Sequence, residues 1–301
     1  MSPTGNGLRT DPPQLANPDK AIGAIEQSIQ AAVADAGVDR VVVNVSGGID
    51  SAVTATLAVQ ALGSDRVTGL ILPAETNSEA NIDDARHVVE ELVIDSQVID
   101  IQPLLDTFLR TVTSHSQESR SDPLGTRQSV MTIPTKHRNN VPLAMGNAAA
   151  RLRMMIAYFE ANTTNALVAG TGNLTELQLG YFTKFGDGAC DFLPIGDLYK
   201  SEIRQLARAL DIRELIIEKK PTAGLWPGQE DEEELGASYE HIDTVLWNLL
   251  ETKIPPAFIA EATETDIDLV EAFHTMVDDA AHKRRTPPTA TELSSTVIEH
   301  T

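Results

Sequence analysis

Short apolar runs alternate with helix-like stretches along the first half of the chain. The run at 41–45 is apolar at four of its five positions, which is typical of a strand buried on both faces of a parallel sheet. Over 18–36, in contrast, apolar residues recur at helical spacing and predict an amphipathic helix. The same criteria predict strands over 67–72, 97–101 and 166–169, and helices over 51–62, 81–92 and 104–114.

This alternation predicts an α/β fold with a doubly wound, mostly parallel sheet. Parallel neighbours need right-handed crossover connections, so we expect helices to flank the sheet on both faces. A further helix is expected to begin at Gly146-Asn147, and extra C-terminal helices are expected over 233–250 and 265–283. Ligands of such sheets bind beyond the carboxyl ends of the strands.

Less regular segments border this region. Residues 1–17 are rich in Pro, Gly, Asn and Thr and predict a flexible N-terminal tail, and residues 289–301 predict a C-terminal tail. We therefore expect a single domain over 18–288. Inside it, residues 115–142 are polar with little periodicity, which favours a mobile or partner-contacting loop.

Composition narrows the functional classes. The 301 residues include 44 Asp and Glu against 23 Lys and Arg, and the net charge of −21 would repel a nucleic acid backbone. An acidic surface also suits a salt-rich cytoplasm, so we expect adaptation to high salt. No apolar run reaches the roughly 20 residues of a membrane span, and the polar N-terminus lacks a signal-peptide core. A single cysteine, Cys190, excludes an internal disulfide, and we expect a cytoplasmic protein.

The most specific local pattern follows the apolar run at 41–45. It reads Ser46-Gly47-Gly48-Ile49-Asp50-Ser51 and continues into a predicted helix. Glycines let backbone N–H groups approach anionic oxygens, and the helix N-terminus adds the positive end of its dipole. No Gly-Lys-Ser/Thr follows the glycines, so the pattern is not a Walker A loop. It resembles the pyrophosphate loop of ATP pyrophosphatases, which cut ATP into AMP and pyrophosphate. The alternative is a strand-to-helix turn that only needs two glycines.

A second cluster makes the resemblance more specific. Its segments are Gly170-Thr171-Gly172-Asn173-Leu174-Thr175-Glu176, Gly180-Tyr181-Phe182-Thr183-Lys184, Lys220-Pro221-Thr222-Ala223 and Leu225-Trp226-Pro227-Gly228-Gln229. With the Ser46 loop, they are similar to NAD synthetase in its short, ammonia-dependent form, over about 18–288. The resemblance implies a Rossmann-like ATP pyrophosphatase fold and a ligase that forms a C–N bond. Such an enzyme adenylates the carboxylate of deamido-NAD, releases pyrophosphate, and lets ammonia displace AMP to give NAD, the last step of NAD biosynthesis.

The resemblance also implies site residues, position by position. ATP would be bound by the loop Asn44, Val45, Ser46, Gly47, Gly48, Ile49, Asp50 and Ser51 and by Thr171, Lys200 and Thr222. Deamido-NAD would be bound by Arg151, Lys184, Asp191, His282 and Lys283. Asp50 and Glu176 would bind Mg²⁺, which prefers carboxylate and phosphate oxygens. The residues implied in catalysis are Asp50, Lys200 and Asp191.

These residues also have ordinary structural interpretations. Asp50 could be an acid favoured at a helix N-terminus, Glu176 an exposed helix residue and Lys200 a surface lysine. Thr171 could serve a turn and Thr222 a helix cap.

Other charged positions are open to similar interpretations. Arg151 and Arg153 could line a solvated helix face, and residues 282–285 could be cations favoured at a helix C-terminus. The acidic run 230–234 could be a solvated face.

Two features bear on the nitrogen donor. Longer relatives add a glutamine-hydrolysing domain with a catalytic cysteine, and this chain has no room for that domain. We expect Cys190 to be a packed residue rather than a nucleophile. We therefore expect free ammonia, or ammonia delivered by a separate protein, as the donor. Asp187 or Asp191 could help to remove a proton from ammonium. Ala149 stands where the family helix usually has a lysine, which removes one charge contact.

The expected partners are the small molecules ATP, deamido-NAD and ammonia, with no nucleic acid and no membrane. The family is dimeric, so we also expect a homodimer, with apolar faces of the helices over 18–36 and 151–160 and of the C-terminal helices as candidate interfaces. Two other functions remain open. One is another ATP pyrophosphatase, tRNA-thiolating or GMP-forming, although a tRNA-thiolating enzyme would want paired cysteines and a basic surface. The other is a non-catalytic nucleotide sensor, which would be expected to lose a metal carboxylate or a phosphate-binding lysine.

Overall fold

The computed structural model describes residues 7–113, 141–224, 226 and 228–289. The expected loop over 115–142 lies outside the described residues apart from its last two positions, which belong to a helix. Most of the expected C-terminal tail, 290–301, lies outside them as well. No helix in the described part of the chain is both long and apolar enough to cross a membrane.

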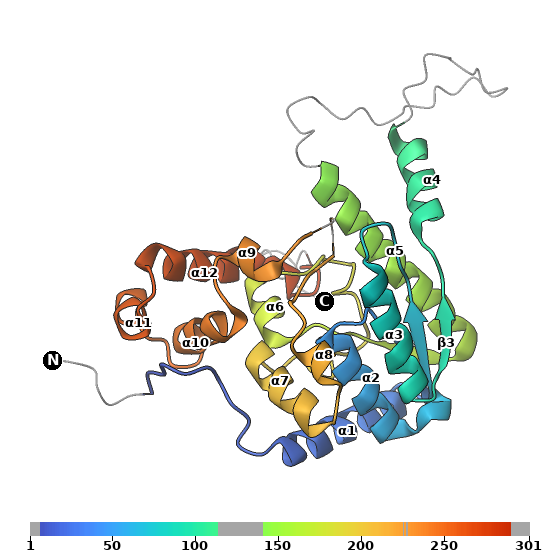
Figure 1. Cartoon of the computed structure of the whole chain (residues 1–301), viewed down its shortest axis with the longest axis horizontal. Coiled ribbons are helices and arrows are strands. Elements are labelled where there is room, and N and C mark those ends of the chain that lie inside the picture. The colour runs from blue at the N-terminus through green and yellow to red at the C-terminus, as the bar shows by residue number, and fades with distance from the viewer. Residues whose placement is uncertain (1–6, 114–140, 225, 227, 290–301) are drawn as a thin grey trace, which may run out of the picture.

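Within the described residues, four strands form a parallel sheet in the order β3-β2-β1-β4 (Figure 1). Their bounds are β1 (Arg40–Asn44), β2 (Val67–Ile71), β3 (Asp95–Val98) and β4 (Ala166–Ala169). The longer helices are α1 (Pro18–Asp35), α2 (Ile49–Leu62), α3 (Glu79–Glu91), α4 (Gln102–Thr113), α5 (Val141–Thr164), α7 (Lys200–Ala209), α10 (Tyr239–Leu250), α11 (Pro256–Thr263) and α12 (Ile267–Asp279). The shorter ones are η1 (Ser64–Arg66), α6 (Leu174–Leu179), α8 (Glu214–Ile217), α9 (Asp231–Leu235) and η3 (Ala280–Lys283).

The central strand β1 shows why helices cover both faces of the sheet. Successive side chains of a strand point to opposite faces. Val41 and Val43 accordingly join a buried cluster with residues of α1, α2, α3 and α7, whereas Val42 joins a second cluster with residues of α5. This arrangement confirms the α/β fold with a parallel sheet flanked by helices.

The order of the strands places the two motifs side by side. β1 pairs with β4, with Val43 opposite Ala169. The loop that begins at Asn44 and the segment that begins at Gly170 therefore leave the sheet together at its carboxyl edge, where ligands of such sheets bind.

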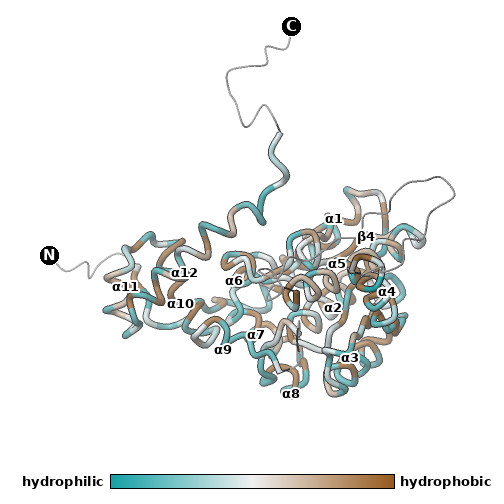
Figure 2. Tube along the Cα trace, turned by 90° about the horizontal axis from the view of Figure 1, so that it is seen from above, coloured by the Kyte–Doolittle hydropathy of each residue, from teal (hydrophilic) through white to brown (hydrophobic). Residues whose placement is uncertain are grey.

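The C-terminal helices form a separate lobe, which lies at one end of the long axis in Figures 1 and 2. α10, α11 and α12 pack around a third buried cluster, which contains Tyr239 and Phe273. Leu179 and Tyr199 also belong to this cluster, and they bracket the segment that joins α6 to α7. The lobe therefore contacts the elements that carry Glu176 and Lys200.

The described part of the N-terminal segment is held against both lobes, unlike the flexible tail that its composition suggests. The Arg9 backbone N–H donates to Asn248 Oδ1 at 2.9 Å, and Asn248 Nδ2 donates to Arg9 O at 2.8 Å. Leu15 N donates to the side chain of Gln205 on α7 at 3.0 Å. These bonds use long-range partners that composition cannot reveal.

Three elements differ from the expected pattern. β3 begins at Asp95 rather than 97, and all four of its residues are exposed, so no apolar run marks this edge strand. α5 begins at Val141, ahead of Gly146. α11 lies between the two expected C-terminal helices and was not expected; Pro255 is its N-cap and Pro256 opens the helix, where proline is favoured.

Candidate active site

The Ser46 loop has the shape of an anion cradle. Gly47 has a φ of +80°, and a Cβ there would lie 2.1 Å from the Asn81 carbonyl oxygen on α3, so only glycine fits. Ser51 Oγ donates to Gly48 O at 2.9 Å and accepts from Ser46 N at 3.2 Å, which closes the turn. In the described part of the chain no side chain caps α2 at Gly48, so the first N–H groups of this helix are left for an anionic ligand.

Lys219, which the sequence patterns did not single out, supports this loop. Lys219 Nζ donates to Gly47 O at 2.9 Å and to Asn81 Oδ1 at 3.1 Å, and it forms an ion pair with Asp84. Because the carbonyl of Gly47 is held by Lys219, the N–H of Gly48 on the other side of the same planar peptide faces away from Lys219. The adjacency of Lys219 to the Lys220-Pro221-Thr222 motif was the only sequence signal for it.

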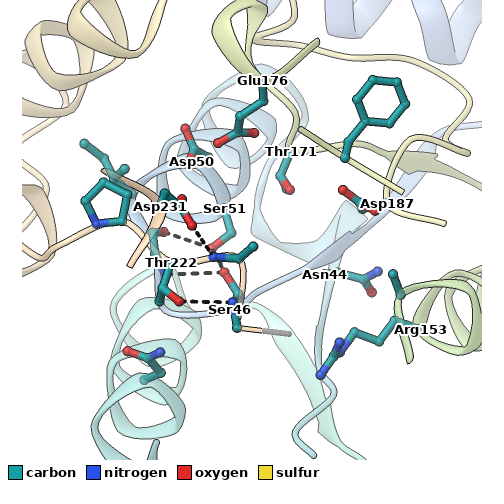
Figure 3. A pocket seen from close by; sticks show the side chains of 18 of the residues that line it. Asn44, Ser46, Asp50, Ser51, Arg153, Thr171, Glu176, Asp187, Thr222 and Asp231 are labelled. Atoms are coloured by element: carbon teal, nitrogen blue, oxygen red, sulfur yellow. Dashed lines mark hydrogen bonds between the residues drawn. The ribbon is translucent and has the colours of Figure 1, made fainter. Parts of the chain in front are cut away.

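Two carboxylates converge on one ammonium group beside the loop. Lys200 Nζ lies 2.5 Å from Asp50 Oδ2 and 3.3 Å from Glu176 Oε1. Figure 3 shows Asp50 and Glu176 next to each other at one side of the pocket. The side chain of Lys200 is only 3% exposed and that of Glu176 19%, so the interpretations as a surface lysine and an exposed glutamate are wrong.

Local structure explains how these groups are presented. Asp50 lies in the first turn of α2, Glu176 in the first turn of α6, and Lys200 opens α7. Asn173 caps α6 by accepting from Glu176 N at 3.0 Å, and its amide donates to Asp50 Oδ1 at 3.1 Å. One buried side chain thus fixes the position of one carboxylate relative to the other.

The three charges influence each other strongly. Burial raises the pKa of Glu176 to about 7, the charge of Lys200 opposes this, and the charge of Asp50 adds to it. Burial by itself lowers the pKa of Lys200, but the charges of Asp50 and Glu176 more than offset it, so the net shift is upward. Lys200 therefore remains charged, and Glu176 is poised to exchange a proton or accept a cation.

The pair Asp50–Glu176 fits a Mg²⁺ ion that also takes ligands from a nucleotide. Both groups are hard carboxylates, and their convergence on Lys200 Nζ shows that they can share a cation. Within the described residues no group of three His, Cys, Asp or Glu side chains is placed to hold a metal by itself. Phosphate oxygens and water would have to complete the coordination, as is usual for Mg²⁺.

The cavity continues away from this cluster, with a volume of about 480 Å³. Arg153 lines its other side, and its guanidinium donates to Leu72 O at 2.9 Å and to Asn77 Oδ1 at 3.0 Å. Burial lowers the pKa of Arg153, so the solvated-face interpretation is wrong for this residue. Asn44 faces the same space (Figure 3), and its buried Oδ1 accepts no hydrogen bond from any residue that the structure describes. This atom is left for a donor on a ligand.

Of the residues implied to bind deamido-NAD, Lys283 lines the cavity. Lys283 Nζ donates to Gly180 O at 2.6 Å and to Phe182 O at 3.1 Å. Lys184 Nζ lies 3.3 Å from His282 Nδ1, and exposed Arg151 donates to Lys184 O at 3.1 Å. Arg151, Lys184 and His282 thus gather along segment 180–188 next to the cavity, and of the four only Lys283 lines it.

Asp187 and Asp191 lie in different surroundings. Asp191 does not line the cavity with Asp50 and Lys200; its Oδ2 accepts from Val168 N at 2.7 Å and its Oδ1 from Tyr158 OH at 3.2 Å. Asp187 does line the cavity, where it is exposed; its Oδ1 accepts from Thr183 N at 2.9 Å, and desolvation by the surrounding protein raises its pKa. Asp187 is therefore the better placed of the two to face a bound substrate.

The acidic run 230–234 is not uniform. Glu233 and Glu234 are exposed, as a solvated face predicts, but Asp231 is 4% exposed. Asp231 accepts from Ala223 N at 2.7 Å and from Tyr239 OH at 3.1 Å. It therefore anchors the segment that carries Thr222 to the C-terminal lobe.

A parallel sheet with a Ser-Gly-Gly-x-Asp-Ser loop at its carboxyl edge, and a carboxylate pair beside it, defines a nucleotide-binding fold of the ATP pyrophosphatase class. The sequence matches the model of the NAD synthase family over residues 21–287. The chain belongs to the NAD synthase family.

Individual relatives agree with this assignment. The NH(3)-dependent NAD(+) synthetase of Thermococcus kodakarensis is 40% identical over 267 residues, which cover 89% of this chain and 95% of the relative. The protein of the same name from Methanosarcina mazei is 41% identical, over 84% and 90% of the two chains. Among solved structures, NMN synthetase from Francisella tularensis aligns with a TM-score of 0.73, 34% identity and coverage of 91% and 98%. NH3-dependent NAD synthetase from Campylobacter jejuni aligns with a TM-score of 0.70, 31% identity and coverage of 91% and 99%.

Proposed function

We propose that this chain catalyses the ATP-dependent amidation of deamido-NAD with ammonia, through an adenylated carboxylate, and releases AMP and pyrophosphate. The observation that carries the proposal is the convergence of Asp50, Glu176 and Lys200 beside the Ser46 loop. A nucleotide sensor has no need to keep both carboxylates and the buried lysine. The names of the relatives support the acid substrate and the nitrogen donor.

The first half-reaction makes use of the loop and the lysine. Attack of the nicotinic acid carboxylate on the α-phosphorus forms a C–O–P bond and breaks the bond to pyrophosphate. The N–H groups at the start of α2 and the hydroxyls of Ser46 and Ser51 would hold the departing pyrophosphate. Lys200 would neutralise developing phosphate charge. Mg²⁺, when bound by Asp50 and Glu176, would supply further charge neutralisation at the phosphates.

The remaining ATP contacts come from the cavity walls. Thr171 and Thr222 both line the cavity, and the latter lies on the segment anchored by Asp231. The unpaired Asn44 Oδ1 offers an acceptor to a hydroxyl or amino group of the nucleotide.

The second half-reaction needs neutral ammonia at the adenylate. Attack by its nitrogen forms the amide C–N bond, AMP leaves, and the extra proton must be removed. We propose Asp187 as the group that takes this proton, because it lines the cavity and desolvation by the surrounding protein raises its pKa. Arg151, Lys184, His282 and Lys283 would bind the phosphates of deamido-NAD. Asp191 would hold its ribose or support that segment.

A homodimer belongs to the proposal. α5 exposes Met155 (63%) and Phe159 (70%), and α4 exposes Leu104 and Phe108 (48% each). The two residues of each pair are four positions apart, so each pair lies on one face of its own helix. We propose that a second copy of the chain covers these exposed faces of α4 and α5. Light scattering after size exclusion should give twice the chain mass, and Phe159→Glu should give a monomer; a monomeric parent protein would contradict the interface.

The expected single domain over 18–288 and the cytoplasmic location stay part of this proposal. The family match over 21–287 supports the extent of the domain.

Isotope exchange between pyrophosphate and ATP tests the adenylation step directly. The exchange should require deamido-NAD, need no ammonium, and be lost in Lys200→Met and Glu176→Gln. Arg208→Met is a matched control, because among the described residues Arg208 forms ion pairs only with the exposed side chains of Glu214 and Glu218. Exchange that proceeds without an acid substrate, or none from folded protein, would overturn the proposal.

A further inference from the structure

Asp243 is a fully buried carboxylate outside the set of proposed substrate contacts. It lies on α10 in the C-terminal lobe and is 0% exposed. It does not line the cavity among the residues that the structure describes. A buried charge is costly unless hydrogen bonds satisfy it, so Asp243 needs hydrogen-bond donors around its carboxylate.

Both oxygens of Asp243 bond to residues that adjoin the active-site charges. Oδ1 accepts from Thr175 Oγ1 at 2.5 Å, and Oδ2 accepts from Ser201 N at 2.7 Å. Thr175 precedes Glu176 in the first turn of α6, and Ser201 follows Lys200 in the first turn of α7.

A third bond closes the connection. Lys200 N donates to Thr175 Oγ1 at 3.0 Å. The Thr175 hydroxyl has one hydrogen, and this hydrogen is used toward Asp243 while the oxygen accepts from Lys200 N. The direction of every bond is therefore determined, and the ionised carboxylate is the acceptor that completes the network.

We propose that Asp243 is a positioning residue. From its place in the C-terminal lobe, it fixes where Glu176 and Lys200 lie relative to each other. It touches neither substrate nor metal; it joins the first turn of α6 to the first turn of α7. The inference rests on the proposed roles of Glu176 and Lys200. Outer groups of this kind orient the groups that bind metal or substrate, and their loss typically lowers affinity or activity roughly 10–100-fold.

The electrostatic surroundings of Asp243 are consistent with an ionised carboxylate whose role is to accept these hydrogen bonds. Burial raises the pKa of Asp243 to about 6, while the bonds from Thr175 and Ser201 and the charge of Lys200 lower it. The positive end of α7 also faces it.

Asp243→Asn tests the proposal with almost no change in volume. An amide offers one oxygen acceptor and an NH₂ donor, so it cannot accept from both Thr175 and Ser201. We expect kcat to fall roughly 10–100-fold and KM for ATP to rise, with KM for deamido-NAD unchanged. Thr175→Val should give the same defect, Thr175→Ser should restore activity by keeping the hydroxyl, and Asp243→Asn/Thr175→Val should be no worse than either single variant.

Asn248→Ala is the matched control for stability. Asn248 lies on the same helix, is 0% exposed, and bonds to Arg9 and Thr244 rather than to the site. It should lower the free energy of unfolding in urea and leave the kinetic constants of the folded protein unchanged.

Calorimetric titration with ATP and Mg²⁺, without deamido-NAD, gives a second readout. Binding should weaken roughly 10-fold or more in Asp243→Asn and not in Asn248→Ala. Normal kinetics and binding in folded Asp243→Asn, or the same kinetic defect in Asn248→Ala, would overturn the inference. If Lys200→Met were also fully active, the proposed function itself would fail; an inactive Lys200→Met beside a normal Asp243→Asn would remove only the role of Asp243.

Discussion

Replacing Lys200 by methionine removes the ammonium group that bonds to Asp50 and Glu176. Methionine keeps an unbranched side chain of similar length, so much of the packing of the buried stem, near the ring of Tyr239, is kept. The backbone N–H of residue 200 also keeps its bond to Thr175. The perturbation is therefore the loss of one buried charge from a group of three.

Breaking a buried ion pair by removing one partner costs about 3–5 kcal/mol, because the remaining charge is left uncompensated. The cost depends on pH through Glu176. Its pKa is raised from its ordinary value of 4.5 to about 7 even with Lys200 present, and the charge of Lys200 lowers it. Without Lys200 the folded-state pKa rises further above the unfolded value.

A group with a raised folded-state pKa contributes stability that is present below its unfolded pKa and is lost as pH rises through its folded pKa. The deficit of Lys200→Met should therefore be about 3–5 kcal/mol near pH 8. It should shrink from pH 8 toward pH 7 by about 1.4 kcal/mol for each pH unit over which Glu176 is protonated in the folded variant but ionised in the folded parent protein, and it should change little between pH 7 and pH 6, where Glu176 is protonated in both.

Urea unfolding of Lys200→Met and the parent protein at pH 8 and pH 6, at constant ionic strength, measures both values. Lys220→Met is the matched control, because the Lys220 side chain is 76% exposed in its ion pair with Glu230, and it should leave the free energy of unfolding unchanged within error. An unchanged stability of Lys200→Met at pH 8, or a deficit that grows toward pH 6, would refute the reasoning.

Three further predictions concern the loop, the thiol and the surface. Gly47→Ala should lower the free energy of unfolding by about 1–3 kcal/mol and raise KM for ATP, because at a φ of +80° the new Cβ would meet Asn81 O. The control Gly23→Ala, on α1 where a Cβ has open space, should not lower the melting temperature. Burial raises the pKa of Cys190 to about 11, so iodoacetamide at pH 8 should label it slowly by mass spectrometry, and fast labelling would contradict this burial. The melting temperature should rise from about 0.1 M to multimolar KCl because salt screens the net charge of −21; a falling temperature would exclude salt adaptation.

Sequence patterns predicted the features that depend on neighbouring residues. The apolar run at 41–45, the glycines after it and the helix that follows are all local, and the structure confirms β1 and α2 there. The edge strand β3 was predicted two residues late, because exposure removes the apolar signal on which strand prediction relies.

The supporting residues of the site could not be predicted in the same way. Lys219 bonds to Gly47 across 172 positions, Arg153 to Leu72 across 81, and Asp243 to Thr175 across 68. A single charged residue, on a helix as Arg153 and Asp243 are or in a bend as Lys219 is, has no periodicity that distinguishes such a contact from a solvated position. Only the fold shows that these side chains turn inward.

The formation of NAD by the purified protein tests the central proposal most directly. The reaction would contain ATP, Mg²⁺, deamido-NAD and ammonium in high KCl, with glutamine in place of ammonium in one arm. A third arm would replace deamido-NAD by the carboxylic acid precursor of NMN, because an NMN synthetase is among the similar structures. We expect NAD with ammonium and deamido-NAD, little product in the other arms, and none from Asp50→Ala. Folded protein that forms no NAD, or that prefers the mononucleotide acid, would contradict the proposed function.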